Sequence, residues 1–258
     1  MKLFEVLALL GALAWLPHLI KIIKDFFSMS EIEIIIQKSG EVGYTAFGSI
    51  FNIQMAFSVS NKDIIISGLK VKFTHESGES KVFSWQGIAQ KFAELKRFEG
   101  ESLSWEKEHS VLAIKLNEKI IEDRFVRFQD EEYILKKDEL EAKLFKKLGY
   151  MRDDNNVDVE LLIKSEEMKD LEAYIKHSLF WKQGNYKIEF LVESNHSFKI
   201  VNNIFEFTLT ILDIDAFEKN KELIEKSYIN VFKLTADSEY KFSKIFWNWR
   251  YPVIKKSS

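Results

Sequence analysis

The side chains best suited to hold a cation lie in a single acidic run. Asp154, Asn156 and Asp158 have the spacing of the first three ligands of an EF-hand calcium loop. The sixth position of such a loop needs glycine for its sharp turn, and the twelfth needs a bidentate glutamate. Val159 and Ser165 stand at those positions. We therefore interpret the run as a solvated loop and expect no metal site.

Imidazole, thiol and phosphate-loop chemistry find little support. No two of the five histidines are three to five residues apart, which is the spacing that lets a local pair bind one zinc ion. The chain has no cysteine, which excludes disulfides, thiol nucleophiles and cysteine-bound metals. Residues 43–49 have the glycine spacing of a phosphate loop but lack the lysine before the serine. These patterns favour a non-catalytic protein without a cofactor.

An enzyme with scattered carboxylates stays open as an alternative. The two carboxylates of a glycosidase need not be close along the chain, so the lack of a motif says little. Trp85, Trp105 or Trp181 would then serve as stacking platforms for a glycan. Two carboxyl groups roughly 5–10 Å apart in one pocket would distinguish this alternative.

The carboxyl-terminal end gathers aromatic residues and an arginine. Trp247, Trp249, Arg250 and Tyr251 have the composition of interface hot spots and are our candidate partner contacts. The same residues match the aromatic belts found at membrane surfaces. The alternative is a last strand that packs its tryptophans onto the body.

A membrane anchor is the strongest element that the sequence predicts. A helix over residues 3–23 has 21 residues and a length of about 31 Å, which matches a hydrocarbon core of roughly 30 Å. Residues 6–16 carry no charge, so such a helix needs lipid or protein on every side. The apolar positions of this predicted anchor are Leu3, Val6, Leu7, Leu9, Leu10, Leu13, Trp15, Leu16, Leu19 and Ile20.

Other fates of this helix are a cleaved signal peptide, an interfacial helix and burial in an oligomer. Cleavage after Ala14 would leave a signal shorter than usual, with Glu5 in its apolar stretch. An interfacial helix needs a polar face, which residues 6–16 lack. The Lys and Arg counts of the two flanks nearly tie, and Lys21 and Lys24 favour a cytoplasmic body.

The remaining residues have the composition of a folded domain. Of all 258 residues, 46% are apolar and only two are proline, which supplies a core and excludes long proline-rich linkers. The net charge of −3 and the lack of a dense basic stripe argue against nucleic-acid binding. One large or two small domains fit this length.

Alternating apolar and polar residues predict strands through most of the body. In residues 51–59 the five odd positions are apolar and share one face. A hairpin loop is expected at residues 75–78. Further strands are expected near residues 31–36, 69–73, 82–85, 111–116, 120–128, 186–192, 205–211 and 228–234.

Helical spacing predicts a few inserted helices. Ile88, Phe92 and Leu95 would share one face of a short helix over residues 87–97. A capping-box-like start at Asp138 begins a helix that should stop near Gly149. Other helices are expected after Ser165 and after Asp215.

These elements predict a mainly β protein. Half-buried strands are typical of antiparallel sheets, and two such sheets form a sandwich. The Gly184-x-Tyr186 start of a late strand, followed by a hairpin partner, resembles immunoglobulin-like sandwiches, although their cysteine pair is missing. We expect an anchor at residues 1–28, a sandwich with helical insertions at 29–235 and an aromatic arm at 236–258. A two-domain split near residue 150 is the alternative.

The sequence therefore predicts a membrane-anchored, non-catalytic binding or adaptor protein that recognises another protein. Its expected partners are the lipid bilayer and either a protein partner or a second copy, and its expected place is the cell membrane with a single span. A subunit of a larger membrane assembly is the second hypothesis, since Ala8, Gly11 and Ala12 would permit close helix packing. The glycan-active enzyme is the third.

Overall fold

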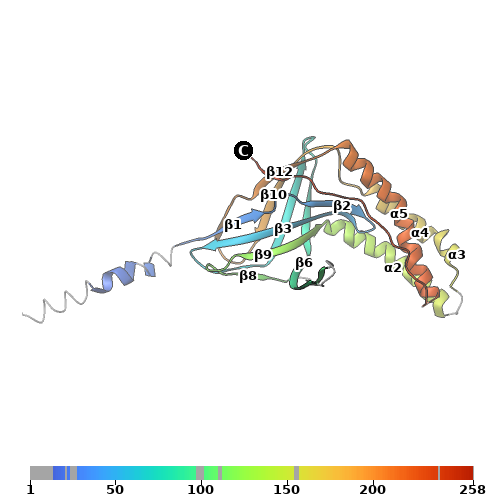
Figure 1. The fold of residues 1–258 in the computed structure, drawn as a ribbon, viewed down its shortest axis with the longest axis horizontal. Helices are drawn as coiled ribbons and strands as arrows, with labels where there is room; N and C mark the ends of the chain where they lie inside the picture. The colour runs from blue at the N-terminus through green and yellow to red at the C-terminus, as the bar shows by residue number, and fades with distance from the viewer. Residues whose placement is uncertain are drawn as a thin grey trace, which may run out of the picture.

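The computed structural model describes residues 14–20, 22–23, 28–96, 102–109, 112–153, 157–237 and 239–257, and gives only the backbone of 88–96 and 102–109. Figure 1 shows a curled sheet with a lobe of helices projecting from one end. The strands are β1 (Ser30–Ile36), β2 (Glu41–Thr45), β3 (Gly48–Ser60), β4 (Ile64–Ile66), β5 (Gly68–His75), β6 (Ser80–Lys96), β7 (Ser102–His109), β8 (Ile114–Leu116), β9 (Glu122–Gln129), β10 (Gly184–Glu193), β11 (Phe198–Val201), β12 (Ile204–Leu209), β13 (Trp249–Arg250) and β14 (Lys255–Lys256). The helices of the lobe are α2 (Glu131–Asp153), α3 (Val159–Ile163), α4 (Glu166–His177) and α5 (Ile211–Ala236).

Within the described residues, twelve of these strands form one mixed sheet. Its main path runs β11-β1-β3-β9-β6-β5-β10-β12-β14, with β2 beside β3, β13 beside β2 and β7 beside β6. The pairing of β1 with β11 is parallel, and the other pairings in this sheet are antiparallel. The remaining strands, β4 and β8, pair with each other.

The mainly β prediction is confirmed, whereas the immunoglobulin-like sandwich is not. A single sheet curls around its own core instead of two sheets packing face to face. Aromatic rings fill that core because the alternating strands turn them inward. The ring centres of Phe51, Phe73 and Phe207 lie within 6.3 Å of one another. Trp181, from the segment that follows α4, packs against two of these rings.

Capping residues set the start of the helices. The carboxylate of Asp130 accepts a hydrogen bond from the Glu132 amide at 3.1 Å, so α2 begins seven residues before the predicted Asp138. The Ser165 hydroxyl caps α4 as predicted. Thr210 and Asp213 form a capping box for α5.

A nearly buried charge network joins α2 to α5. The Lys137 ammonium lies 2.7 Å from the Glu141 carboxylate, and the Tyr228 hydroxyl donates to the same carboxylate at 2.5 Å. The side chains of Lys137 and Glu141 are only 7% and 18% exposed. Burial, aided by that carboxylate, raises the pKa of Tyr228 well above its ordinary value.

Several elements follow the sequence pattern. The alternating run at 51–59 lies in β3, and its odd positions are buried. The hairpin loop at 75–78 connects β5 to β6, with Gly78 at a φ of 88°. The two late strands are β10 and β12, which pair with each other in antiparallel fashion. The short strand β11 lies in the segment that connects them.

Two predictions of element type were wrong. Residues 87–96, expected in a helix, belong to the long strand β6. The register between β6 and β7 shifts between Lys91 and Ala93, and such a bulge breaks the two-residue alternation so that the apolar spacing looks helical. Residues 228–234, expected in a strand, lie in α5, where buried residues alternate because the helix is covered on more than one side.

Part of the predicted anchor is described. Residues 14–20 and 22–23 are helical, and their large apolar side chains are exposed, from 50% for Leu16 to 69% for Trp15. Leu19 and Ile20 are about half exposed as well. Leu3, Val6, Leu7, Leu9, Leu10 and Leu13 lie outside the described residues. Among the helices that are described, none is both long and apolar enough to cross a bilayer.

Candidate functional site

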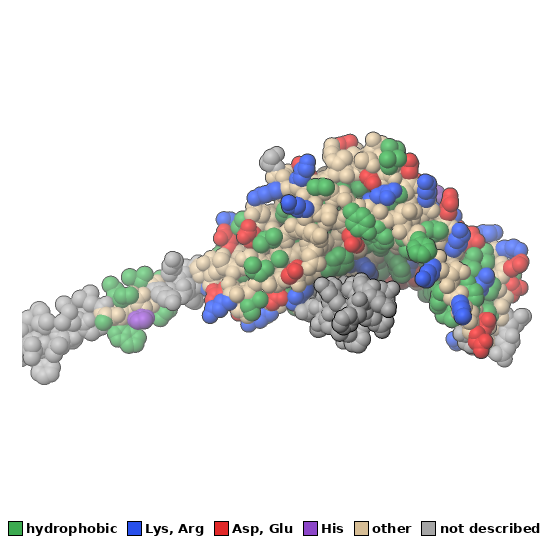
Figure 2. All heavy atoms as spheres, in the orientation of Figure 1, with side chains coloured by type: hydrophobic (Ala, Val, Ile, Leu, Met, Phe, Trp, Pro, Cys, Tyr) green, Lys and Arg blue, Asp and Glu red, His purple; other side chains and the backbone are tan. Residues whose placement is uncertain are grey.

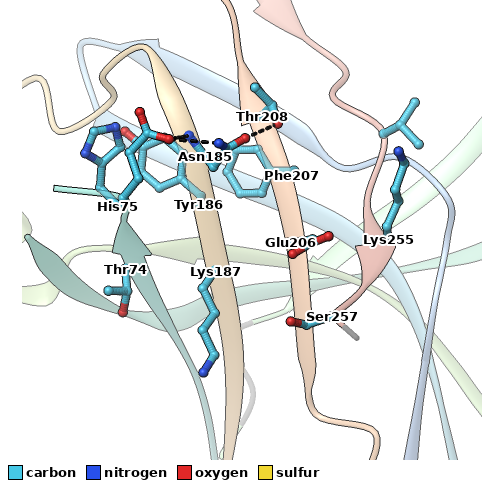
Figure 3. A pocket seen from close by; sticks show the side chains of 12 residues that line it. Thr74, His75, Asn185, Tyr186, Lys187, Glu206, Phe207, Thr208, Lys255 and Ser257 are labelled. Carbon is cyan, nitrogen blue, oxygen red and sulfur yellow. Dashed lines mark hydrogen bonds between the residues drawn. The ribbon is translucent and has the colours of Figure 1, made fainter. Parts of the chain in front are cut away.

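A groove of about 690 Å³ lies on the sheet where β5, β10, β12 and β14 run side by side (Figure 3). Alternation turns the apolar side chains of these strands into the core and leaves polar ones facing outward. Its polar lining includes Thr74, Lys187, Glu206, Thr208, Lys255 and Ser257. The sheet therefore builds a polar, open recess rather than an enclosed cavity.

A row of charged residues crosses the groove. The strand registers place Thr74 beside Lys187, Lys187 beside Glu206, and Glu206 beside Lys255. None of these three charged groups lies in an ion pair with a residue that the structure describes. Two ammonium groups and one carboxylate are thus available to hydrogen-bond a ligand that carries both signs of charge.

One end of the groove is held by a chain of hydrogen bonds. The Glu76 carboxylate accepts bonds from the backbone and side-chain amides of Asn185 at 3.0 and 2.8 Å. The Asn185 side-chain oxygen accepts a bond from the Thr208 hydroxyl at 2.6 Å (Figure 3). This chain fixes the β5–β6 loop to β10 and β12, so the end of the groove is rigid.

The His75 ring holds the β5–β6 loop at that end of the groove. Its Nε2 lies 3.0 Å from the Gln183 carbonyl oxygen, which can only accept, so Nε2 carries the proton. Its Nδ1 then accepts from the amide and hydroxyl of Ser77, at 3.2 and 2.9 Å. The two ring nitrogens thus join the β5–β6 loop to the segment ahead of β10. Gly184 permits this approach, because a Cβ there would lie 2.5 Å from Nε2.

The groove opens where the terminal strand leaves β12. The Ser257 amide donates to the Ile204 carbonyl at 3.3 Å, so the even-numbered residues of β12 direct their N–H and C=O groups towards β14. By the same alternation, the backbone of Thr208 faces away from β10 and into the groove. Towards the amino end of β14, Lys255 is the last residue that pairs with β12. Val253, two residues before it, pairs with Ser39 instead. The edge of β12 beside Thr208 is therefore open.

Exposed apolar side chains lie in the groove lining and just after the end of β12. Val253 lines the groove and is 61% exposed. Ile211 and Leu212, which directly follow the end of β12 and Thr210, are 53% and 69% exposed. A polar groove with an exposed apolar residue in its lining is suited to binding a peptide segment.

The predicted aromatic contacts divide into inward and outward side chains. Trp249 lies on Gly43, where a Cβ would be 2.4 Å from its ring, and β13 pairs with β2. The Arg250 Nε lies 3.1 Å from the Asp213 carboxylate. Trp247 packs against the core as a partly buried residue. Tyr251 is 62% exposed. Contact of these four residues with a partner stays a prediction.

Two of the three predicted glycan platforms, Trp85 and Trp181, are described, and both pack on the core. Trp181 is buried, and its indole N–H donates to the Gly43 carbonyl at 2.9 Å, so its ring is part of the core. Trp85 is half-buried against the same core, and the side chain of Trp105 lies outside the described residues. In the part of the chain that is described, no group of three histidine, aspartate or glutamate side chains is arranged to hold a metal ion.

Sequence reasoning missed the groove. Alternation indicated that Lys187 and Glu206 face outward, but nothing along the chain indicated that Lys255 lies beside them. Comparisons with family models, curated proteins and solved structures find no match. The function is therefore argued from this geometry.

Proposed function

We propose that the protein is a membrane-tethered binding protein that holds an extended segment of a partner protein in the groove of its curled sheet. The observation that carries the proposal is the open edge of β12 at Thr208 beside the row Lys187, Glu206 and Lys255. A backbone edge recognises any extended chain, and charged side chains in fixed register select among sequences.

The tether is supported by the apolar helix ahead of β1. Its described side chains, including Trp15 and Ile20, are more than half exposed, which is costly in water. A bilayer would cover them, and Lys21 and Lys24 favour a body on the cytoplasmic side. Protease protection in spheroplasts tests this placement, because a cytoplasmic body resists protease added from outside.

Crosslinking tests the partner-binding groove. Because the chain has no cysteine, Val253→Cys can carry one photoreactive maleimide at the groove. In native membranes we expect a discrete protein adduct from position 253. The matched position is Leu135→Cys on α2, which is 71% exposed and belongs to the helical lobe rather than to the strands that line the groove.

A second pair of variants tests the β12 edge itself. Thr208→Pro removes the N–H that faces the groove and leaves the bonds between β12 and β10 in place. Thr208→Ala keeps that N–H and loses the same hydroxyl, so it is the matched control. We expect Pro to abolish the adduct at 253 and Ala to keep it. An adduct that persists in Thr208→Pro would contradict strand-edge recognition.

A subunit of a larger membrane assembly is the second candidate. The described part of the helix is apolar on its exposed sides, as expected of a helix that packs against others within a bilayer. Crosslinks from position 11 or 12 to another membrane protein, or to a second copy, would favour it. Crosslinks to lipid alone would favour a single tether.

A further inference from the structure

The segment after α5 forms a strap, residues 239–248, that runs back along the helical lobe (dark red in Figure 1). Buried asparagines of α5 hold it. The Asn230 side chain donates to the Ser243 carbonyl at 2.9 Å and accepts from the Ser243 amide at 3.2 Å. Asn220 makes the equivalent pair with Asn248 at 3.0 and 2.8 Å. The strap is therefore an ordered part of the surface.

A groove of about 320 Å³ lies between the strap and α5. Leu223 and Ile229 of α5 line it together with Ile245 and Phe246 of the strap. Phe246 is 78% exposed, and Phe242 is 56% exposed. These large side chains project from the strap while Ile245 turns inward, so an apolar surface is left open to the surroundings.

Lysines surround this apolar surface. Lys226, Lys233 and Lys244 line the groove, and Lys241 lies next to Phe242 in the strap. The Lys233 ammonium lies 5.6 Å from the Tyr240 ring. Among the residues that the structure describes, none of these four ammonium groups has a carboxylate partner. Figure 2 shows basic, acidic and apolar side chains along the lobe.

We propose that the strap docks on the surface of a bilayer that contains anionic lipids. The lysines would contact phosphate and carboxylate groups, and Phe242 and Phe246 would enter the boundary between headgroups and acyl chains. Alternating aromatic and basic residues on one exposed segment fit that boundary, which offers negative charge and apolar volume at neighbouring depths. The groove has less than half the volume of the groove on the sheet, which favours contact with a surface over an enclosed peptide.

This contact is separate from the partner groove on the sheet and from the tether. It would fix the helical lobe against the membrane, whereas a tether alone leaves the body free to rotate. Each lysine near an anionic surface strengthens binding about fivefold, so Lys241→Gln with Lys244→Gln should lower the ratio of docked to undocked strap about 25-fold.

The experiment follows a fluorophore on the strap of the full-length protein. Phe246→Cys carries an environment-sensitive dye, and spin-labelled phosphatidylcholine in the vesicles quenches a dye that enters the bilayer. Vesicles are phosphatidylcholine with or without phosphatidylserine. We expect quenching at 246 with phosphatidylserine, little without it, and loss of quenching at high salt. A dye at Leu135→Cys should stay unquenched.

Charge variants and flotation separate the proposals. Lys241→Gln with Lys244→Gln should abolish quenching, whereas Lys115→Gln on β8 with Lys199→Gln on β11, an equal charge change away from the strap, should not. Co-flotation with neutral vesicles reports the tether alone. Flotation without quenching at 246 overturns the strap proposal and keeps the tether. Quenching with anionic vesicles but no flotation with neutral ones keeps the strap proposal and overturns the tether.

Two other results would also overturn strap docking. One is equal quenching in neutral and anionic vesicles that the lysine substitutions leave unchanged. The other is an emission of the dye at 246 that changes with polyglutamate, an acidic peptide, but not with any vesicle. That result would identify the strap as a site for acidic protein segments.

Discussion

The Asn220 side chain offers the sharpest test of how the chain is held together. It is fully buried, and its amide donates to the backbone carbonyls of Tyr44 and Asn248 at 2.8 and 3.0 Å. Its oxygen accepts from the backbone and side-chain amides of Asn248, both at 2.8 Å. One residue of α5 thus joins β2 and the terminal segment to the helical lobe.

Asn220→Ala removes all four hydrogen bonds and leaves buried backbone groups without a partner. A hydrogen bond contributes about 1 kcal/mol net, and each buried group left unpaired costs about 1–3 kcal/mol. Since water can reach the Asn248 end more easily than the Tyr44 end, we expect a loss of about 4 kcal/mol in the free energy of unfolding. That corresponds to a urea midpoint about 1.5 M lower.

Urea unfolding of the full-length protein in mild detergent measures this loss, followed by tryptophan fluorescence. Asn195→Ala is the control, because Asn195 is exposed and makes no hydrogen bond in the described structure; its effect should stay within about 0.5 kcal/mol. If Asn220→Ala cost less than about 1 kcal/mol, the four hydrogen bonds of this amide would not stabilise the fold as their distances indicate.

Three further predictions concern other parts of the fold. Burial raises the pKa of Tyr186 to about 12. The stability that the neutral hydroxyl contributes is therefore complete below pH 10 and is lost as the pH rises through 12. Urea midpoints should fall over that interval, and the fall should be less steep in Tyr186→Phe. Gly43→Ala places a Cβ 2.4 Å from the Trp249 ring, which should cost about 1–3 kcal/mol and speed amide exchange in β13, whereas unchanged exchange would show that the indole moves aside freely. Lys137→Ala leaves the Glu141 carboxylate without its ammonium partner, with only the Tyr228 hydroxyl bonded to it, and should cost about 3 kcal/mol by urea unfolding. Lys137→Met with Glu141→Leu should cost less, and equal losses would argue against a penalty for the buried charge.

The sequence by itself determined the elements whose signals are local. Residues 51–59 form a strand because every second side chain is apolar and packs on one side of a sheet. Ser165 begins α4 because its hydroxyl satisfies the free amide of Met168. The polar faces of β10 and β12 could be predicted in the same way, including the outward positions of Lys187 and Glu206.

Only the tertiary structure decided how those elements are used. Alternation cannot distinguish one curled sheet from two packed sheets, because both bury the same side of each strand. Residues 228–234 looked like a strand because α5 is packed from several directions, which no local pattern records. Lys255 joined the candidate groove only through pairing with Glu206, far away along the chain. Contacts between distant residues depend on how the whole chain packs, and that is why the groove and the strap emerged from the structure.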